Sequence, residues 1–167
     1  ADIRREEILA DIDFYTAGAK AQLALAGSGD PAAAAGDVRT FMTKHNKSFH
    51  VPQAIETLGD LLAAAGQPAD ARTEYAKLAK AKSPYFELKS ALLVGRTYQT
   101  EGDHAQAQAE FDKVLASTDD GAQIAPLKLA ATLRDTADDA IDTPIEFLKD
   151  LGEFLKEYPS ITINMVL

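Results

Sequence analysis

The spacing of apolar and polar positions along the 167-residue chain is helical almost throughout, and prolines and glycines divide it at regular intervals. Several prolines stand directly before an apolar periodic run, where the first turn of a helix tolerates them. No segment within this series shows the strict alternation of a half-buried strand. The pattern predicts eight helices, near residues 3–26, 31–45, 52–65, 68–81, 85–101, 103–117, 122–140 and 143–157.

Residues that favour helix ends mark the same boundaries. Asp30, Ser83 and Thr143 each precede a proline, and short polar side chains of this kind cap the first turn of a helix. Glycine closes helices because it adopts the left-handed backbone conformation at low cost. The glycines expected to do so are Gly27, Gly66, Gly102 and Gly121. Together these signals predict the all-α class.

An internal repeat is the strongest signal in the chain. Residues 55–78 fall on residues 91–114 after a shift of 36, with small residues on small and large on large. The matched pairs are Leu58–Val94, Gly59–Gly95, Leu62–Tyr98, Gly66–Gly102, Ala71–Ala107, Tyr75–Phe111 and Leu78–Val114. A glycine inside a helix costs about 1 kcal/mol relative to alanine. Its recurrence at Gly59 and Gly95 therefore predicts two close helix crossings, and we expect the paired large residues to be core.

Residues 53–81 and 89–117 resemble units of the tetratricopeptide repeat (TPR) family. Each carries a large residue followed by glycine, a second large residue, a glycine turn, then alanine and an aromatic residue. The period of 36 departs from the family's 34. The resemblance implies a right-handed α-solenoid of antiparallel helix hairpins. We expect a single domain over 1–167, with units near 3–48, 52–81, 85–117 and 122–158.

The same resemblance implies a function. In this family the first helix of each unit lines a concave groove that binds a protein or peptide segment. The positions that correspond are Gln53, Glu56 and Asp60 in one unit and Lys89, Arg96 and Gln99 in the next. The expected function is a non-catalytic scaffold or adaptor, with a partner of basic or mixed charge. Chaperone-binding members of the family hold the C-terminal carboxylate of their partner with lysines and asparagines. Glu56 and Asp60 place negative charge there instead, which disfavours such a partner.

A structural self-assembly module is the alternative, with copies stacking through terminal helices into a homo-oligomer. It depends on an apolar stripe near the C-terminus, formed by Phe147, Leu148, Leu151, Phe154 and Leu155 and followed by an apolar tail. Such a stripe requires a cover. The tail could fold back over it, or another unit could cover it. The apolar tail also leaves open whether the chain is a fragment of a longer repeat protein.

Composition and charge limit the classes of partner that we expect. The chain has 26 acidic and 17 basic residues, and its net charge of −9 disfavours nucleic acid, which is bound through Lys and Arg. It has no cysteine, which excludes disulfides and thiolate chemistry. No run reaches the roughly 18 apolar residues of a membrane span. The residues around 41–54 resemble bacterial members of the family. We therefore expect a soluble protein of the bacterial cytoplasm or periplasm, with no signal peptide visible.

Motifs for chemistry are absent from the sequence. The run Gly27-Ser28-Gly29-Asp30 lacks the remainder of a phosphate-binding loop and reads as a turn. His45 and His50 lie in a link between helices, where we expect them to be exposed, and no third ligand completes a metal site. His104 follows Asp103, an expected helix cap, and should also be exposed. We expect no enzyme activity, no catalytic residue, no metal site and no cofactor.

Overall fold

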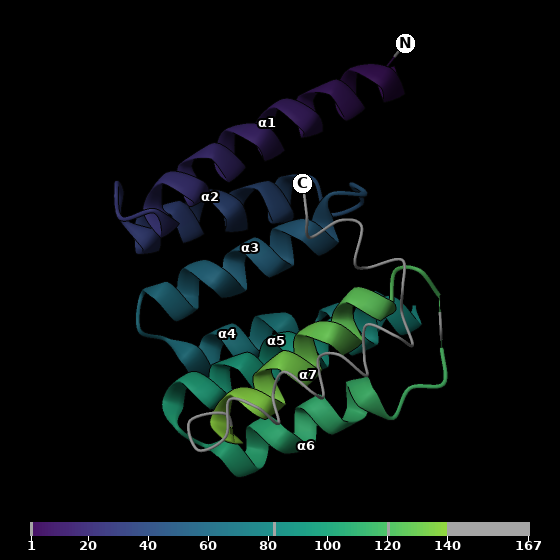
Figure 1. The fold of residues 1–167 in the computed structure, drawn as a ribbon. Coiled ribbons are helices and arrows are strands. Elements are labelled where there is room, and N and C mark those ends of the chain that lie inside the picture. The colour runs from purple at the N-terminus through teal and green to yellow at the C-terminus, as the bar shows by residue number, and fades with distance from the viewer. Residues whose placement is uncertain (1, 82, 120, 140–167) are drawn as a thin grey trace, which may run out of the picture. The chain divides into compact units, whose positions relative to one another are not determined.

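The computed structural model describes residues 2–81, 83–119 and 121–139, and these residues are helical without any strand (Figure 1). The predicted all-α class is therefore confirmed for this part of the chain. The elements are α1 (Asp2–Leu25), α2 (Pro31–Lys44), α3 (Val51–Ala64), α4 (Pro68–Tyr75), the 3₁₀ helix η1 (Leu78–Ala81), α5 (Pro84–Glu101), α6 (His104–Leu115) and α7 (Ala125–Asp139). The predicted helix at 143–157 and its apolar stripe lie outside the described residues.

Helix ends follow most of the sequence signals. Gly27, Gly66 and Gly102 have φ angles of 79°, 75° and 79°, a region that disfavours other residues. Asp30 caps α2, since its Oδ1 accepts from the backbone N–H of Ala32 at 2.9 Å. Asp103 caps α6 in the same way, through the N–H of Gln106 at 3.2 Å, and His104 after it is exposed as expected.

Ser83 stands at the predicted N-cap position of α5, directly before Pro84, although its side chain makes no capping hydrogen bond. The predicted end signal at Gly121 is wrong, because α6 ends at Leu115, six residues earlier. Its carbonyl instead accepts from the N–H groups of Ile124 and Ala125, at 2.7 and 3.3 Å. Gly121 thus belongs to the turn that leads into α7, which begins at Ala125 and not at 122.

The single helix predicted over 68–81 is also wrong. The α-helix α4 ends at Tyr75, and η1 follows after a turn. The N–H of Lys77 donates to the carbonyl of Glu74, and that of Lys80 donates to Lys77, both three residues back. This tighter winding replaces the α-helical pattern, while Leu78 stays buried at 1% exposure. Leu78 therefore lies in the core although the helix around it is not an α-helix.

The chain divides into two compact units, residues 1–81 (unit 1) and 82–167 (unit 2), which are described separately. In unit 1, α1 packs against both α2 and α3, and α3 also pairs with α4. In unit 2, α5 pairs with α6, and α7 packs against both of them. Each unit is thus a helix hairpin with further helices packed along it.

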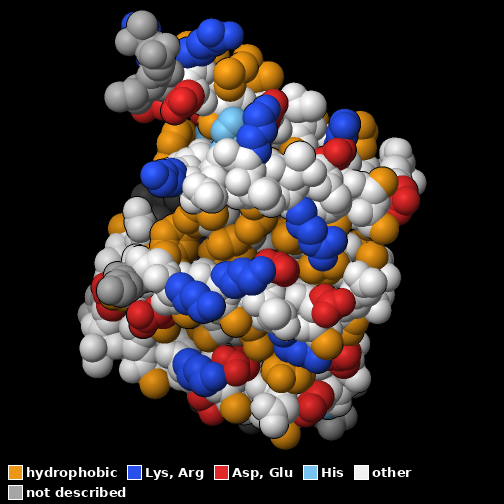
Figure 2. All heavy atoms as spheres, turned by 180° about the vertical axis from the view of Figure 1, so that it is seen from behind, with side chains coloured by type: hydrophobic (Ala, Val, Ile, Leu, Met, Phe, Trp, Pro, Cys, Tyr) orange, Lys and Arg blue, Asp and Glu red, His pale blue; other side chains and the backbone are white. Residues whose placement is uncertain are grey.

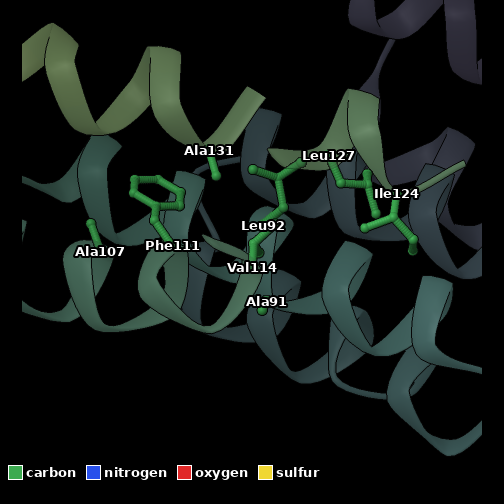
Figure 3. Close-up of a cluster of buried hydrophobic side chains, with 8 residues drawn as sticks. All are labelled: Ala91, Leu92, Ala107, Phe111, Val114, Ile124, Leu127 and Ala131. Carbon is green, nitrogen blue, oxygen red and sulfur yellow. The ribbon is translucent and has the colours of Figure 1, made fainter. Parts of the chain in front are cut away.

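The core of unit 2 is built from all three of its described α-helices (Figure 3). Small residues allow the helices to approach, and larger ones fill the space between them. The cluster consists of Ala91, Leu92, Ala107, Phe111, Val114, Ile124, Leu127 and Ala131. The ring of Phe111, which is 1% exposed, is one of its members. In unit 1 the corresponding aromatic residue is Tyr75, with 0% exposure.

The glycine of each repeat lies beneath this aromatic ring. A Cβ atom added to Gly59 would lie 2.6 Å from Cδ1 and Cζ of Tyr75, and one added to Gly95 would lie 2.5 Å from Cε1 of Phe111. Real Cβ atoms do not come so close to other atoms. The predicted close crossings are therefore confirmed, and they recur 36 residues apart in the two units.

The predicted core is confirmed with two exceptions. Leu58, Leu62, Tyr75, Leu78, Phe111 and Val114 are buried. Val94 and Tyr98 are only half-buried, and Tyr98 packs against the edge of the unit 2 core. In the part of the chain that the structure describes, no helix combines the length and apolarity needed to cross a bilayer.

Candidate functional site

The best candidate site is a groove between α1 and α3 in unit 1, which encloses a cavity of about 420 Å³. Its α1 wall is largely apolar and includes Phe14, Tyr15, Ala19 and Leu25. Its α3 wall is polar and consists of Gln53, Thr57 and Asp60. We call this cavity the α1–α3 groove. One apolar wall facing one polar wall suits an amphipathic ligand.

The polar wall follows from helical spacing. Gln53, Thr57 and Asp60 are four and three residues apart, so their side chains share one face of α3. Gln53 is exposed, and the other two are half-buried. The neighbouring buried positions Leu58, Leu61 and Leu62 hold α3 against the core and so fix the direction of that face.

Asp60 is anchored from the side of α4. The phenolic O–H of Tyr75 donates to Asp60 Oδ1 at 2.6 Å. The repeat aromatic therefore has two roles, because its ring packs at the glycine crossing while its hydroxyl orients a groove carboxylate. Phe111, its counterpart in unit 2, has no hydroxyl and can fill only the first role.

Two of the three groove positions predicted in unit 1 line the cavity. Gln53 and Asp60 do, whereas Glu56, half-buried on α3, is not among the lining residues. Thr57 lines it instead, although the sequence reading did not select it. The spacing signal was present, because Thr57 follows Gln53 by one helical turn.

The three predicted residues of unit 2 lie on α5 and are described within that unit. Lys89 Nζ donates to the hydroxyl of Tyr85 at 3.3 Å and lies 5.6 Å from the centre of its ring. Gln99 Nε2 donates to the carbonyl of Arg134 at 2.8 Å, which ties α5 to α7. Gln99 thus has a packing role within unit 2, and Lys89 is likewise engaged, by Tyr85.

Arg96 on α5 and Arg134 on α7 lie close enough together to influence each other's charge. Partial burial lowers the pKa of the Arg134 guanidinium, and the nearby charge of Arg96 lowers it further. An arginine remains charged at neutral pH despite such a shift. Two cations on neighbouring helices therefore face a common region, whereas the groove of unit 1 carries the carboxylate of Asp60.

The histidine link departs from its predicted exposure. His50 is buried at 6% exposure, and its ring stacks on Phe14 with centroids 4.1 Å apart and planes 7° apart. Its Nε2 lies 3.0 Å from Asp11 Oδ1. The His45 side chain is 12% exposed, and its Nε2 lies 2.8 Å from Asp13 Oδ2. Asp11 and Asp13 of α1 thus bind the link between α2 and α3. The predicted exposure of His45 and His50 is therefore wrong.

Asp13 is the more heavily bonded of these two aspartates. Hydrogen bonds from the Lys44 ammonium, at 2.7 Å, and from the His45 ring hold the pKa of Asp13 below its ordinary value. A lowered carboxyl pKa stabilises the fold above the ordinary pKa near 4, and that stabilisation is lost as the pH falls through the folded-state pKa. The attachment of α1 to the link should therefore weaken in acid.

Replacing Lys44 with methionine tests this directly. We expect the titration midpoint of the Asp13 carboxyl, followed by ¹³C NMR, to lie below 3.8 in the parent protein and to rise in Lys44→Met. The stability difference between the parent and Asp13→Asn should be present at pH 7 and shrink below about pH 4. A midpoint that Lys44→Met leaves unchanged would contradict the assigned cause.

A larger cavity of about 580 Å³ lies between the first half of α1 and residues 44–49. Its walls carry opposite charges, and several of the ionisable groups already bind within unit 1. Asp11 is engaged by His50, and Lys44 and His45 by Asp13. We favour the smaller α1–α3 groove as the functional site, because its α1 wall is largely apolar, apart from Gln22, and its α3 wall is polar.

Metal and nucleic-acid chemistry find little support in the described residues. Among them, no three His, Asp or Glu side chains are close enough together to hold a metal ion. Figure 2 shows basic, acidic and apolar side chains interspersed over the face that it displays, without a continuous basic band there. Such a band is the usual signature of a surface that binds phosphate backbones.

Comparisons of the chain with protein-family models, with curated proteins and with solved structures each returned no match.

Proposed function

We propose that this chain is a non-catalytic interaction module that binds a protein segment in the α1–α3 groove. The observation that carries the proposal is the division of that groove into an apolar wall on α1 and a polar wall on α3. A segment with both apolar and polar side chains can use both walls at once, with its apolar residues against Tyr15 and Leu25.

We extend the proposal to a TPR-like solenoid of right-handed, antiparallel hairpins. Two observations support it. The glycine–aromatic crossing recurs with a 36-residue period, at Gly59–Tyr75 and at Gly95–Phe111. The first helix of one hairpin also packs on the helix that follows the hairpin, as α1 does on α3 and α5 on α7. In repeat proteins of this kind, the first helices form the binding surface.

Asp60 gives the partner its charge preference. Its carboxylate stands on the polar wall, so a lysine or arginine in the bound segment would gain an opposite charge there. A segment whose basic and apolar residues enter the α1–α3 groove is the ligand class that we propose.

The proposed module uses His45 and His50 for structure. Catalysis by a serine–histidine pair would need the serine hydroxyl in hydrogen-bond contact with the imidazole. The described contact between Ser48 and His50 instead runs from the His50 backbone N–H to Ser48 Oγ, at 3.2 Å, and orders the link. The His50 ring is occupied by Phe14 and Asp11. This supports an anchoring role for the His–Asp pairs.

Charge removal at Asp60 tests the groove. The probes are synthetic peptides of 12 residues with apolar residues spaced for one helical face, carrying either two lysines or two glutamates. We expect the lysine peptides to bind more tightly, and Asp60→Asn to weaken them about 3- to 10-fold, as a single partly exposed charge would. Asparagine keeps an oxygen that can accept from Tyr75, so the crossing stays intact. The affinities are measured by fluorescence anisotropy.

The matched control is Asp70→Asn, which removes the same charge from the exposed first turn of α4. It should leave the affinity within about twofold, and high salt should reduce the Asp60 effect because exposed charges are screened. Equal losses in both variants would mean that only net charge matters. Binding of no lysine peptide below millimolar concentration would overturn the proposed groove.

A further inference from the structure

Helix α1 has a second apolar face, directed away from its unit. Its buried face is formed by Ala10, Phe14, Ala17, Ala21 and Ala24. Its other apolar residues include Ile8, Ile12, Tyr15 and Leu23, with exposures of 51%, 55%, 65% and 56%. At about 100° per residue, the two sets point to opposite sides of the helix. We call the exposed set, together with the exposed Ala19 between its members, the outer stripe.

A helix with solvent on its outer side normally carries polar residues there. The outer stripe instead follows one side of α1 from Ile8 to Leu23, over about four turns. A row of large exposed side chains on one face marks an interaction surface more often than an accident of sequence. In Figure 1, α1 lies at the edge of unit 1, so within that unit no helix covers its outer side.

The positions along the outer stripe fit a second copy of the same helix. A midpoint between Tyr15 and Thr16 leaves Ile8 and Leu23 equally distant on either side, and likewise Ile12 and Ala19. Two copies in antiparallel orientation would therefore pair Ile8 with Leu23 and the large Ile12 with the small Ala19. Tyr15 would meet its own copy at the two-fold axis. A two-fold interface needs such a self-complementary surface.

The charges at the ends of α1 favour the same orientation. Arg4 and Arg5 lie exposed in the first turns, at the end where the helix dipole disfavours cations. The last turn of α1 contains no basic residue, although cations stabilise that end. In an antiparallel pair, Arg4 and Arg5 of each copy would lie beside the C-terminal end of α1 in the other. Each copy would then supply the charge that the other lacks.

We propose that the outer stripe of α1 binds a second copy of this chain through an antiparallel α1–α1 contact. This inference does not rest on the groove, because Ile8, Ile12 and Leu23 are not among the residues that line the groove. Tyr15 and Ala19 belong to both surfaces, so Ile12 is the position that separates them. The two proposals can therefore fail separately. If Ile12→Glu loses self-association but still binds the peptides, the stripe and the groove are separate surfaces. If the parent associates but binds no peptide, only the groove proposal fails.

Cysteine cross-linking tests both the contact and its direction, because the chain has no cysteine of its own. Tyr15→Cys should form a disulfide-linked dimer under mild oxidation. The double variant Ile8→Cys/Leu23→Cys should do so as well, since the two positions meet across copies. Leu23→Cys alone should not, because its two copies would lie about 22 Å apart along the helices, beyond the reach of a disulfide.

Sedimentation equilibrium supplies the second readout. The parent should approach twice the 17.9 kDa mass of one chain as concentration rises, and Ile12→Glu should remain a monomer with an unchanged helical circular dichroism spectrum. Ala33→Glu, which places the same charge at an exposed site on α2, should associate like the parent. A parent that stays monomeric at millimolar concentration overturns the proposal. Efficient cross-linking of Leu23→Cys to itself overturns the antiparallel orientation.

Discussion

Truncation of Phe111 to alanine is expected to lower the free energy of unfolding by about 3–5 kcal/mol, the cost typical of removing a buried aromatic side chain. The ring is 1% exposed and belongs to a cluster of buried residues drawn from the three described α-helices of unit 2. Tyr75→Ala should cost a similar amount in unit 1, where it also removes the hydroxyl that holds Asp60. Chemical denaturation followed by circular dichroism measures both.

Tyr15→Ala provides the comparison, because the Tyr15 side chain is 65% exposed. Its loss should cost at most about 1 kcal/mol, since little apolar surface leaves a buried environment. Similar losses for Tyr15→Ala and Phe111→Ala would show that Phe111 is not part of a well-packed core.

The second large effect is expected at the paired glycines. Alanine in place of a glycine within a helix normally stabilises it by up to about 1 kcal/mol. At Gly59 and Gly95 the sign should reverse, because the added Cβ would overlap the ring of Tyr75 or Phe111. Gly95→Leu should overpack the crossing and cost about 1–3 kcal/mol. Thermal and denaturant unfolding of each variant give the measurement.

Gly36 is the matched control on α2, because a Cβ added there would meet no atom within 4 Å. Gly36→Ala should therefore be neutral or stabilising. A second check pairs Gly95→Ala with Phe111→Leu, and the double variant should lose less than the sum of the two single losses, since the smaller side chain makes room. Stabilisation by Gly95→Ala alone would show that the helices do not approach closely there.

The sequence predicts the helices and their crossings well, because these depend on local backbone chemistry. Gly27, Gly66 and Gly102 close helices by a property of glycine itself. The pairing of Gly59 with Tyr75 is visible because the same small and large residues recur 36 positions later. The break between α4 and η1 is not visible, since either winding buries Leu78 and the choice depends on tertiary packing.

The histidines show where local reasoning fails. His45 and His50 lie in a polar link, which usually indicates exposure. Their surroundings come from α1, more than 30 residues earlier, which supplies Asp11, Asp13 and Phe14. The two apolar faces of α1 pose a related problem, because a helix with apolar residues on both sides does not reveal which side is buried.

For the candidate site, the sequence could predict only which residues of one helix share a face, from their spacing. Gln53 and Asp60 were selected because the family resemblance predicts that this face of the helix lines a groove, and both line the cavity. The opposite wall on α1 was not found, because nothing in residues 14–25 indicates which of them face α3. The packing role of Gln99 was also missed, since its acceptor is a backbone carbonyl on α7, 35 residues later.

The location of the binding surface is the claim that an NMR titration tests most directly. Amide chemical shifts of the ¹⁵N-labelled chain are followed as the tightest lysine peptide is added. The proposed function predicts that the shifted amides cluster at residues 14–25 of α1 and 53–60 of α3, and that Asp60→Asn reduces their response. Shifts confined to α4, α6 or the 44–49 link, with the α1–α3 groove unperturbed, would contradict it.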